Sequence, residues 1–311
     1  MTVDQPAGGT PTDQPTDAAP SDQPAGGTPT DQPTAGAPTD QAERRDGWGF
    51  PTAVALFTAI PVPRRAARHL DRQLAAQALR WLPVVGAGLG LVAGVPLFAS
   101  MVLAPYATGA VLGSALAVAV LALATRGLHL DGLADTVDGL GSATPPAQAL
   151  AIMRKPDIGA FGVLAIVLVV LIKVAALATV STAYGAGVGV LALVAAEHSG
   201  RVAVVLAART GVPSARPSGL GALVAGSADR TALLGVAVTT ALLAAVPLVW
   251  GAPATSLRLL AGSAVGLAVA EVWRHRVVRR IGGVTGDVFG SIVELASVAV
   301  LLTIALSAGG R

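Results

Sequence analysis

The chain has 311 residues, of which 53% are hydrophobic and only 13% are charged. A soluble globular domain carries about a quarter charged residues, so this composition excludes an ordinary soluble protein and is typical of a protein with many membrane spans. The sequence contains no Cys, which excludes disulfides and thiolate chemistry, and its net charge of +3 is small.

The first 46 residues differ from the rest of the chain. The sequence DQPAGGTPTDQPT occurs at residues 4–16 and again at residues 22–34. A segment rich in Pro, Gly, Thr and Asp buries too little apolar surface to offset the entropy of ordering, so we predict a disordered tail over residues 1–46. The tail lacks the basic and apolar regions of a signal peptide. We expect residues 47–311 to form one integral membrane domain.

Seven later stretches are candidates for membrane spans, each of which takes about 17–25 mostly apolar residues. They cover residues 82–104, 108–124, 161–182, 188–207, 231–250, 256–270 and 288–307, the sixth being the shortest. Residues 50–63 are too short and too bounded by proline to span, so we expect an interfacial or re-entrant segment there. The predicted fold class is therefore all-α: a polytopic membrane helix bundle of about seven transmembrane helices, preceded by the disordered tail.

The basic residues lie almost entirely on one side of these spans. The N-terminal segment and the loops after the second, fourth and sixth spans are rich in Arg, whereas the opposite side has only Arg258 and Arg311. By the positive-inside rule, we predict a multi-pass cell-membrane protein whose N-terminus and long loops are cytoplasmic. A transporter needs polar groups that are reachable from both sides, and the sequence shows almost none on the outer side.

Three aspartates follow the second predicted span, within the sequence LHLDGLADTVDG. If this segment is helical, Asp131, Asp135 and Asp138 occupy positions i, i+4 and i+7 on one face. Their like charges repel each other, and Mg²⁺ or Mn²⁺ prefers carboxylate ligands, so we predict that these three residues form a catalytic metal site. The acids also fit a solvated helix start. The neighbouring glycines, which we expect to let a ligand approach closely, are Gly127, Gly132, Gly139 and Gly141.

His129 lies beside the first of these aspartates. As a general base or a phosphate donor it would serve the same site. As a lone histidine among apolar residues it fits a packed, hydrogen-bonded ring equally well.

A glycine-rich turn, GGVTGDVFGSIVE from residue 282, leads into the last span. Free N–H groups at a helix N-terminus bind phosphate, so we predict substrate contacts at Gly283 and Gly286. Asp287 and Glu294 are seven residues apart on one helical face, and we predict that both are catalytic because ionisable groups within a membrane are costly. Asp287 alone also fits an ordinary helix cap.

Three arginines are candidates for binding phosphate groups of a substrate. Arg154 follows the aspartate segment, although it also fits a simple anchor at the membrane surface. Arg201 lies one turn after Glu197 in the fourth span, where we expect an ion pair that leaves Arg201 free to face a phosphate. Arg216 lies in the next loop.

Two further basic features lie near the same side. Lys173, in the third span, is a candidate partner for Glu271 or Glu294. The arginines of residues 274–280 would contact anionic lipid head groups or an anionic substrate. One face of the protein therefore combines acids for a divalent ion, glycine turns and arginines. This combination predicts metal-assisted phosphoryl or nucleotidyl transfer on a bulky or lipid-embedded substrate.

The motifs resemble the signature of the cobalamin synthase family, the adenosylcobinamide-GDP ribazoletransferases. The strongest match is HLDGLADTVDGL at residues 129–140, and the resemblance covers residues 49–306 in consistent order. Further matches are FTAIPVP at 57–63, IMR at 152–154 with IG at 158–159, Arg216 with GLG at 219–221, and residues 282–294. Two positions depart from the pattern. Arg-Lys-Pro-Asp at 154–157 stands where the family usually has Arg-Asp-Ser, and Gly200 separates Ser199 from Arg201.

The resemblance implies a late step of cobalamin biosynthesis. The cobinamide phosphate of adenosylcobinamide-GDP would be transferred to the ribose 3′-hydroxyl of α-ribazole, or of its 5′-phosphate, with release of GMP. It also implies Mg²⁺ as the cofactor, held by two or more of the three aspartates, with Asp287 or Glu294 completing the site. Arg154 and Arg201 would offset charge on the leaving GMP. Besides these substrates we expect the lipid bilayer as a partner and no nucleic acid, and the sequence points to no particular protein partner.

One alternative enzyme fits the same physics. A CDP-alcohol phosphotransferase also handles phosphates at a membrane, but its pattern has two further aspartates on a second helix after an Ala-Arg pair. Nothing after Asp138 matches that pattern. A polytopic transporter is the alternative from another class.

Overall fold

The computed structural model describes residues 48–62, 70–104 and 107–309. Within these ranges the chain forms helices, two isolated β-bridges and no strand, which confirms the predicted all-α class. The predicted tail over residues 1–46 and Pro63 of the N-terminal segment lie outside the described residues.

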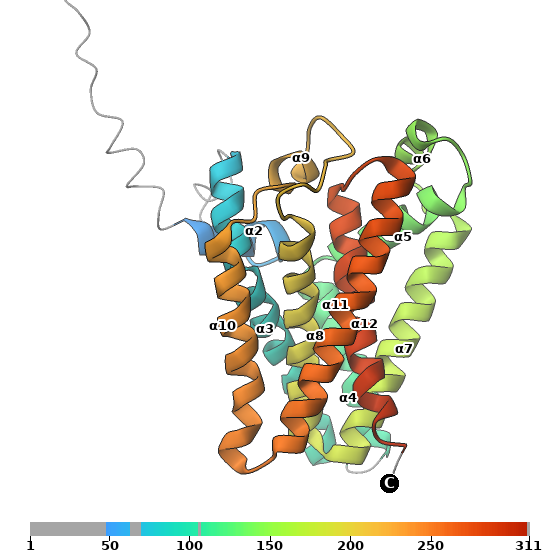
Figure 1. The fold of residues 1–311 in the computed structure, drawn as a ribbon. Helices are drawn as coiled ribbons and strands as arrows, with labels where there is room; N and C mark the ends of the chain where they lie inside the picture. Colours follow the sequence, from blue (N-terminus) through green and yellow to red (C-terminus); the bar gives the residue numbers. More distant parts are fainter. Residues whose placement is uncertain (1–47, 63–69, 105–106, 310–311) are drawn as a thin grey trace, which may run out of the picture. The chain divides into compact units, whose positions relative to one another are not determined.

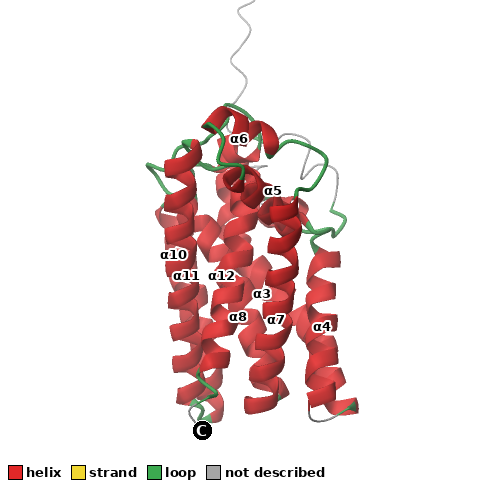
Figure 2. Ribbon diagram, turned by 90° about the vertical axis from the view of Figure 1, so that its right-hand side faces the viewer, coloured by secondary structure: helices red, strands yellow, loops and turns green. Residues whose placement is uncertain are grey.

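Seven helices are long and apolar enough to cross a membrane, as predicted. They are α3 (Arg72–Leu103), α4 (Ala107–Ala124), α7 (Ala160–Tyr184), α8 (Ala186–Ala207), α10 (Arg230–Ala245) continued by the 3₁₀ helix η2 (Val246–Trp250), α11 (Pro253–Ile281) and α12 (Gly286–Leu306). Figures 1 and 2 show these helices running side by side. The chain is therefore a multi-pass membrane protein.

Two spans extend well beyond their predicted ends. α3 begins at Arg72 rather than at residue 82, because Asp71 accepts a hydrogen bond from the N–H of Leu74 at 2.8 Å and caps the helix. α11 continues to Ile281 rather than ending at residue 270. Arg274 pairs with Glu271 within the helix at 2.6 Å, and Arg279 and Arg280 lie in its last turn, where basic residues are favourable. α3 thus begins before its apolar stretch, and α11 ends after its own.

Four short helices lie together at one end of the bundle (Figure 1). They are α2 (Gly49–Phe57), α5 (Leu128–Gly141), α6 (Pro146–Ile152) and α9 (Leu220–Val224). The nine residues of α2 are too few to span, as predicted for this segment, and α2 packs on α3 with Ala53 and Phe57 buried. This end of the bundle therefore carries the segments that the sequence singles out for chemistry.

α8 is the central helix of the bundle and packs against α3, α7, α11 and α12. Its contact with α3 relies on small residues, as is common between membrane helices. A Cβ atom added at Gly90 of α3 would lie 2.6 Å from the Cα of Val194 in α8. The backbones of these two helices therefore touch at this point.

This contact can be tested with two neighbouring glycines. We expect Gly90→Ala to lower the melting temperature of the detergent-purified protein, because α3 and α8 must move apart. Gly88→Ala is the matched control, since nothing lies within 4 Å of a Cβ atom there and alanine favours a helix by about 1 kcal/mol over glycine. Equal melting temperatures for the two variants would contradict the close α3–α8 contact.

Candidate functional site

α5 carries the three aspartates that the sequence singles out. The helix runs from Leu128 to Gly141, so Asp131, Asp135 and Asp138 do occupy one face. Leu133 and Ala134 are buried on the side of α5 that packs against α7 and α12, whereas Asp131 is exposed and the other two aspartates are partly exposed. The helix thus buries its apolar side and leaves the carboxylates at the surface.

α12 crosses α5 at very short range. A Cβ atom added at Gly132 would lie 2.7 Å from the backbone oxygen of Asp287, and one added at Gly290 would lie 3.2 Å from the Cα of His129. Glycine at both positions lets the two backbones meet. As a result, the first turn of α12 lies beside the aspartate face of α5.

This packing corrects the prediction that Gly132, Gly139 and Gly141 make room for a ligand. For Gly127, where nothing lies within 4 Å of an added Cβ atom, close approach of a ligand stays a prediction. The space beside Gly132 is taken by α12. The side chain of Met153 fills the space beside Gly139, at 2.5 Å from an added Cβ atom, and the ring of Phe161 fills that beside Gly141, at 2.9 Å. These glycines therefore serve contacts within the protein.

Asp287 receives two hydrogen bonds in the first turn of α12. Arg216 Nη1 lies 3.3 Å from Asp287 Oδ2, and the hydroxyl of Thr285 donates to the same oxygen at 3.2 Å. Thr285 also caps the helix, since its Oγ1 accepts from the N–H of Val288. The alternative that Asp287 is an ordinary helix cap is therefore wrong. The other branch of Arg216, Nη2, donates to the carbonyl of Leu150 at 3.1 Å.

The glycine-rich turn brings Arg216 to this position. Val284 N donates to the carbonyl of Pro213 at 2.9 Å, and Ala215 N donates to the carbonyl of Val284 at 3.0 Å, so the two loops pair through their backbones. A Cβ atom at Gly283 would lie 2.4 Å from Ala215 N. The structure thus buries Gly283 in loop packing, contrary to the predicted substrate contact. Gly286 is partly exposed, and its contact stays a prediction.

Asp138 has different surroundings from the other two aspartates. Its carboxylate oxygens accept hydrogen bonds from Gly159 N at 2.7 Å and Gly162 N at 2.8 Å, which ties the start of α7 to α5. Among the described residues, no group of three His, Cys, Asp or Glu side chains is gathered closely enough to hold a metal ion. The structure therefore gives Asp138 an orienting role and does not confirm a three-aspartate site.

The remaining carboxylates repel one another. The pKa of Asp135 is raised to about 7, first by burial and then by the nearby carboxylates of Asp131, Asp287 and Asp138. The guanidinium of Arg216 opposes this rise without cancelling it. A carboxyl group in this position would gain from a bound cation, which stabilises its charged form.

The chemistry of these side chains fits a divalent ion with oxygen ligands. Mg²⁺ commonly uses one or two protein carboxylates and completes its shell with water and substrate phosphate oxygens. Asp131 and Asp135 of α5, together with Asp287 of α12, offer carboxylates of this kind. Two of them from different helices, Asp131 and Asp287, would hold the predicted Mg²⁺.

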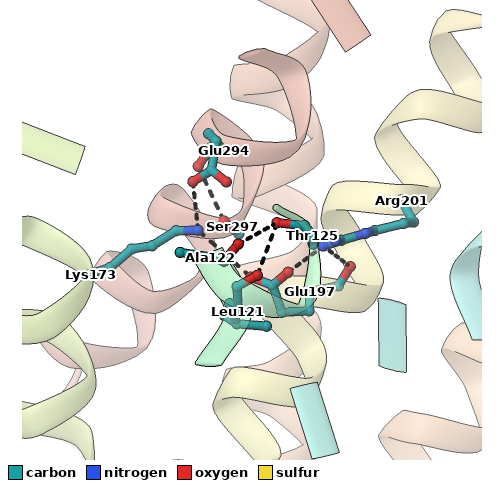
Figure 3. Close-up of polar contacts among 8 residues, drawn as sticks. All are labelled: Leu121, Ala122, Thr125, Lys173, Glu197, Arg201, Glu294 and Ser297. Atoms are coloured by element: carbon teal, nitrogen blue, oxygen red, sulfur yellow. Dashed lines mark hydrogen bonds and ion pairs between the residues drawn. The ribbon is translucent and has the colours of Figure 1, made fainter. Parts of the chain in front are cut away.

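A second group of charges is buried in the membrane-spanning part (Figure 3). Lys173 Nζ of α7 lies 2.7 Å from Glu294 Oε2 of α12 and 3.6 Å from Glu197 Oε1 of α8. Arg201 pairs with Glu197 within α8. The predicted Glu197–Arg201 pair is thus confirmed. Of the two candidate partners of Lys173, the structure shows Glu294, whereas Glu271 pairs with Arg209 and Arg274. We give the name buried ion network to Lys173, Glu197, Arg201 and Glu294, whose two positive and two negative charges balance.

This network corrects two predicted site residues. Arg201 is only 1% exposed and directs its guanidinium at Glu197, so it does not face a phosphate. Glu294 is 6% exposed and binds Lys173, although it shares a helical face with Asp287. Helical spacing places two residues on one face, but that face is accessible only at the end where Asp287 lies.

His129 is a packed ring in the structure. It is 3% exposed and stacks on Phe57, with the ring centroids 6.4 Å apart. Burial, followed by the positive charges of Arg201 and Lys173, holds the pKa of His129 well below its usual range. Its Nε2 has no hydrogen-bond partner among the described atoms. A neutral, enclosed imidazole does not support the predicted catalytic role.

Two further arginines lie at the same end of the bundle. Arg154 is exposed in the loop before α7, and its predicted phosphate contact stays a prediction. Arg126 precedes α5 and lines the same cavity as Asp131. In the sequence Arg126 is one of several loop arginines, and its place directly before Gly127 and the aspartate helix is the signal that distinguishes it.

Comparison with known proteins agrees with this arrangement. Residues 49–305 match the family described as Cobalamin-5-phosphate synthase. The chain belongs to this family. It is 41% identical over 265 residues to the adenosylcobinamide-GDP ribazoletransferase of Frankia casuarinae, covering 82% of this chain and 94% of that protein. It is 32% identical over 255 residues to the protein of the same name from Escherichia coli, covering 82% and 98%. No solved structure matches the chain.

Family membership also bears on the alternatives. A match over nearly all of the described residues argues against a CDP-alcohol phosphotransferase or a transporter. The same match leaves out residues 1–46, which the resemblance also left out.

The buried ion network can be tested by removing one charge. We expect Lys173→Met to destabilise the protein by about 3–5 kcal/mol, because Arg201 is then the only cation of the network left to balance the buried Glu294 and Glu197. Unfolding in detergent, followed by circular dichroism, would measure this loss. The double variant Lys173→Met/Glu294→Gln is the control, and it should recover a large part of the stability. A Lys173→Met protein as stable as wild type would contradict the network.

Proposed function

We propose that the chain transfers the cobinamide phosphate of adenosylcobinamide-GDP to the ribose 3′-hydroxyl of α-ribazole or its 5′-phosphate. The hydroxyl oxygen forms a new bond to the phosphorus that carries the cobinamide. The bond from that phosphorus to the bridging oxygen of the pyrophosphate breaks, and GMP leaves. The hydroxyl proton is released. Named relatives with this activity and a shared family support the proposal.

The observation that carries the proposal is the meeting of α5 and α12. It places Asp287 beside Asp131 and Asp135 at one end of a membrane bundle, with Arg216 hydrogen-bonded to Asp287. Phosphoryl transfer needs groups that hold a pyrophosphate and offset its charge, and little other chemistry from the protein. This end of the bundle offers such groups.

In the proposed reaction Asp131 of α5 and Asp287 of α12 would hold Mg²⁺. The ion, when bound, neutralises charge on the pyrophosphate. Asp135, the neighbouring carboxyl group that is not a ligand in this proposal, would take up the hydroxyl proton.

Arg216 is partly exposed beside Asp287, whereas Arg201 is enclosed in the bundle. Arg216 Nη1 lies 3.3 Å from Asp287 Oδ2, and Arg216 Nη2 donates to the carbonyl of Leu150. We assign Arg216 to the pyrophosphate, in place of the enclosed Arg201. Arg154 is the exposed candidate for the leaving GMP.

We also propose that this end of the bundle faces the cytoplasm of a cell-membrane protein. The excess of arginine in the loops at this end supports that orientation. Water-soluble nucleotide substrates would then reach the aspartates directly.

The proposal predicts a metal-dependent release of GMP. Protein in lipid nanodiscs, given adenosylcobinamide-GDP, α-ribazole and Mg²⁺, should release GMP, and EDTA should stop the reaction. Asp131→Asn should lower kcat by at least about 100-fold, the scale of loss when charge stabilisation of a transition state is removed. The replaced side chain is exposed, so the melting temperature should stay at the wild-type value.

Chromatography would measure GMP in each reaction. A wild-type protein that releases no GMP would overturn the proposed function. A wild-type rate in EDTA, or in Asp131→Asn, would overturn the metal site while leaving the reaction in place.

A further inference from the structure

A cavity of about 570 Å³ opens beside the first turn of α5. Its walls come from the end of α2, the α4–α5 turn, α5 and Ile166 of α7. The wall is fixed where α2 meets α4, because Ala59 N donates to the carbonyl of Ala124 at 2.6 Å. Small-molecule sites usually occupy about 300–1,000 Å³, so this cavity has the size of a nucleoside site and is too small for a corrinoid.

The lining of the cavity is divided between apolar and charged groups. Leu56, Leu128, Leu130 and Ile166 provide aliphatic walls. The charged groups that line it are Asp131 and Arg126. Ligand sites typically combine apolar walls with a few polar groups that fix orientation. This lining suits an aromatic base with a polar sugar and an anionic group.

The backbone holds Arg126 in an unusual conformation. Its φ angle is +51°, in the left-handed region that side chains other than Gly and Asn rarely adopt. Among the described non-glycine residues only Ala143, just beyond the other end of α5, shares a positive φ. Strained residues cluster at ligand sites, where the surrounding structure holds them in place.

The guanidinium of Arg126 is exposed and has no acidic partner within the described part of the chain. Two other arginines at this end pair with acids: Arg80 with Asp229 at 2.6 Å, and Arg209 with Glu271 at 2.6 Å. A cation that lines a cavity without a carboxylate partner is available for an anion.

From this cavity, and resting on the proposed function, we infer that Arg126 binds the 5′-phosphate of the acceptor nucleotide. The aliphatic walls hold its heterocyclic base. The ribose lies toward Asp131, which belongs to the carboxylate cluster. Arg126 therefore sets the preference for a phosphorylated acceptor over the unphosphorylated nucleoside.

Arg126→Gly is the sharpest test, because glycine adopts a φ of +51° without strain and the variant should fold at least as well as wild type. Losing one charge-assisted contact should raise KM for α-ribazole 5′-phosphate about 10- to 100-fold. KM for α-ribazole should change less than about twofold, and Arg126→Lys should be intermediate because it keeps the charge. Arg230→Gln is the control, since Arg230 is exposed at the start of α10 and away from the cavity.

Calorimetric titration of α-ribazole 5′-phosphate, without the donor substrate, separates this inference from the proposed function. Binding that weakens in Arg126→Gly but not in Arg230→Gln supports the inference, whether or not GMP is released. Equal losses for both acceptors, equal acceptor affinities in wild type, or unchanged binding in Arg126→Gly would overturn it. A wild-type protein that binds the acceptor but releases no GMP would overturn the reaction alone.

Discussion

The close crossing of α5 and α12 is the contact on which the candidate site depends. Gly132 and Gly290 remove the two side chains that would hold these helices apart. Their absence lets Asp287 approach the aspartates of α5, and the pairing of the Gly283 turn with the preceding loop delivers Arg216 to the same place. The candidate site for phosphates thus lies where two helices and one loop meet through their backbones.

The buried ion network holds together the membrane-spanning helices that support that site. A lone charge within the membrane would be costly, whereas two acids and two bases in contact offset each other. The network joins α7, α8 and α12, and Asp138 joins the start of α7 to α5. α5 and α12, which carry the carboxylates, are therefore joined through α7, both within the membrane-spanning part and at the end of the bundle. The buried charges of the ion network stabilise the bundle, whereas the carboxylates of the candidate site lie at its end.

Local pattern was enough to predict the spans, the aspartate face of α5 and the Glu197–Arg201 pair, because each depends on spacing along one helix. It failed where the outcome depends on a distant segment. Asp138 and Asp131 look alike in the sequence, and only the hydrogen bonds from the start of α7 distinguish Asp138. Likewise, only the position of α12 shows that Gly132 contacts a helix and not a ligand. Arg201 was misjudged because sequence spacing does not show which face of α8 is enclosed. The resemblance identified the chemistry, while the division of labour among the acids came from tertiary contacts.

We propose that Asp287 of α12 and Asp131 of α5 bind one divalent ion together. Mn²⁺ takes oxygen ligands as Mg²⁺ does and can be followed by electron paramagnetic resonance. Titration of Mn²⁺ into wild type, Asp131→Asn, Asp287→Asn and the double variant would test the claim directly. The account predicts that each single variant weakens binding and that the double variant loses much less than the sum of the two losses. Wild-type affinity in Asp287→Asn would contradict it.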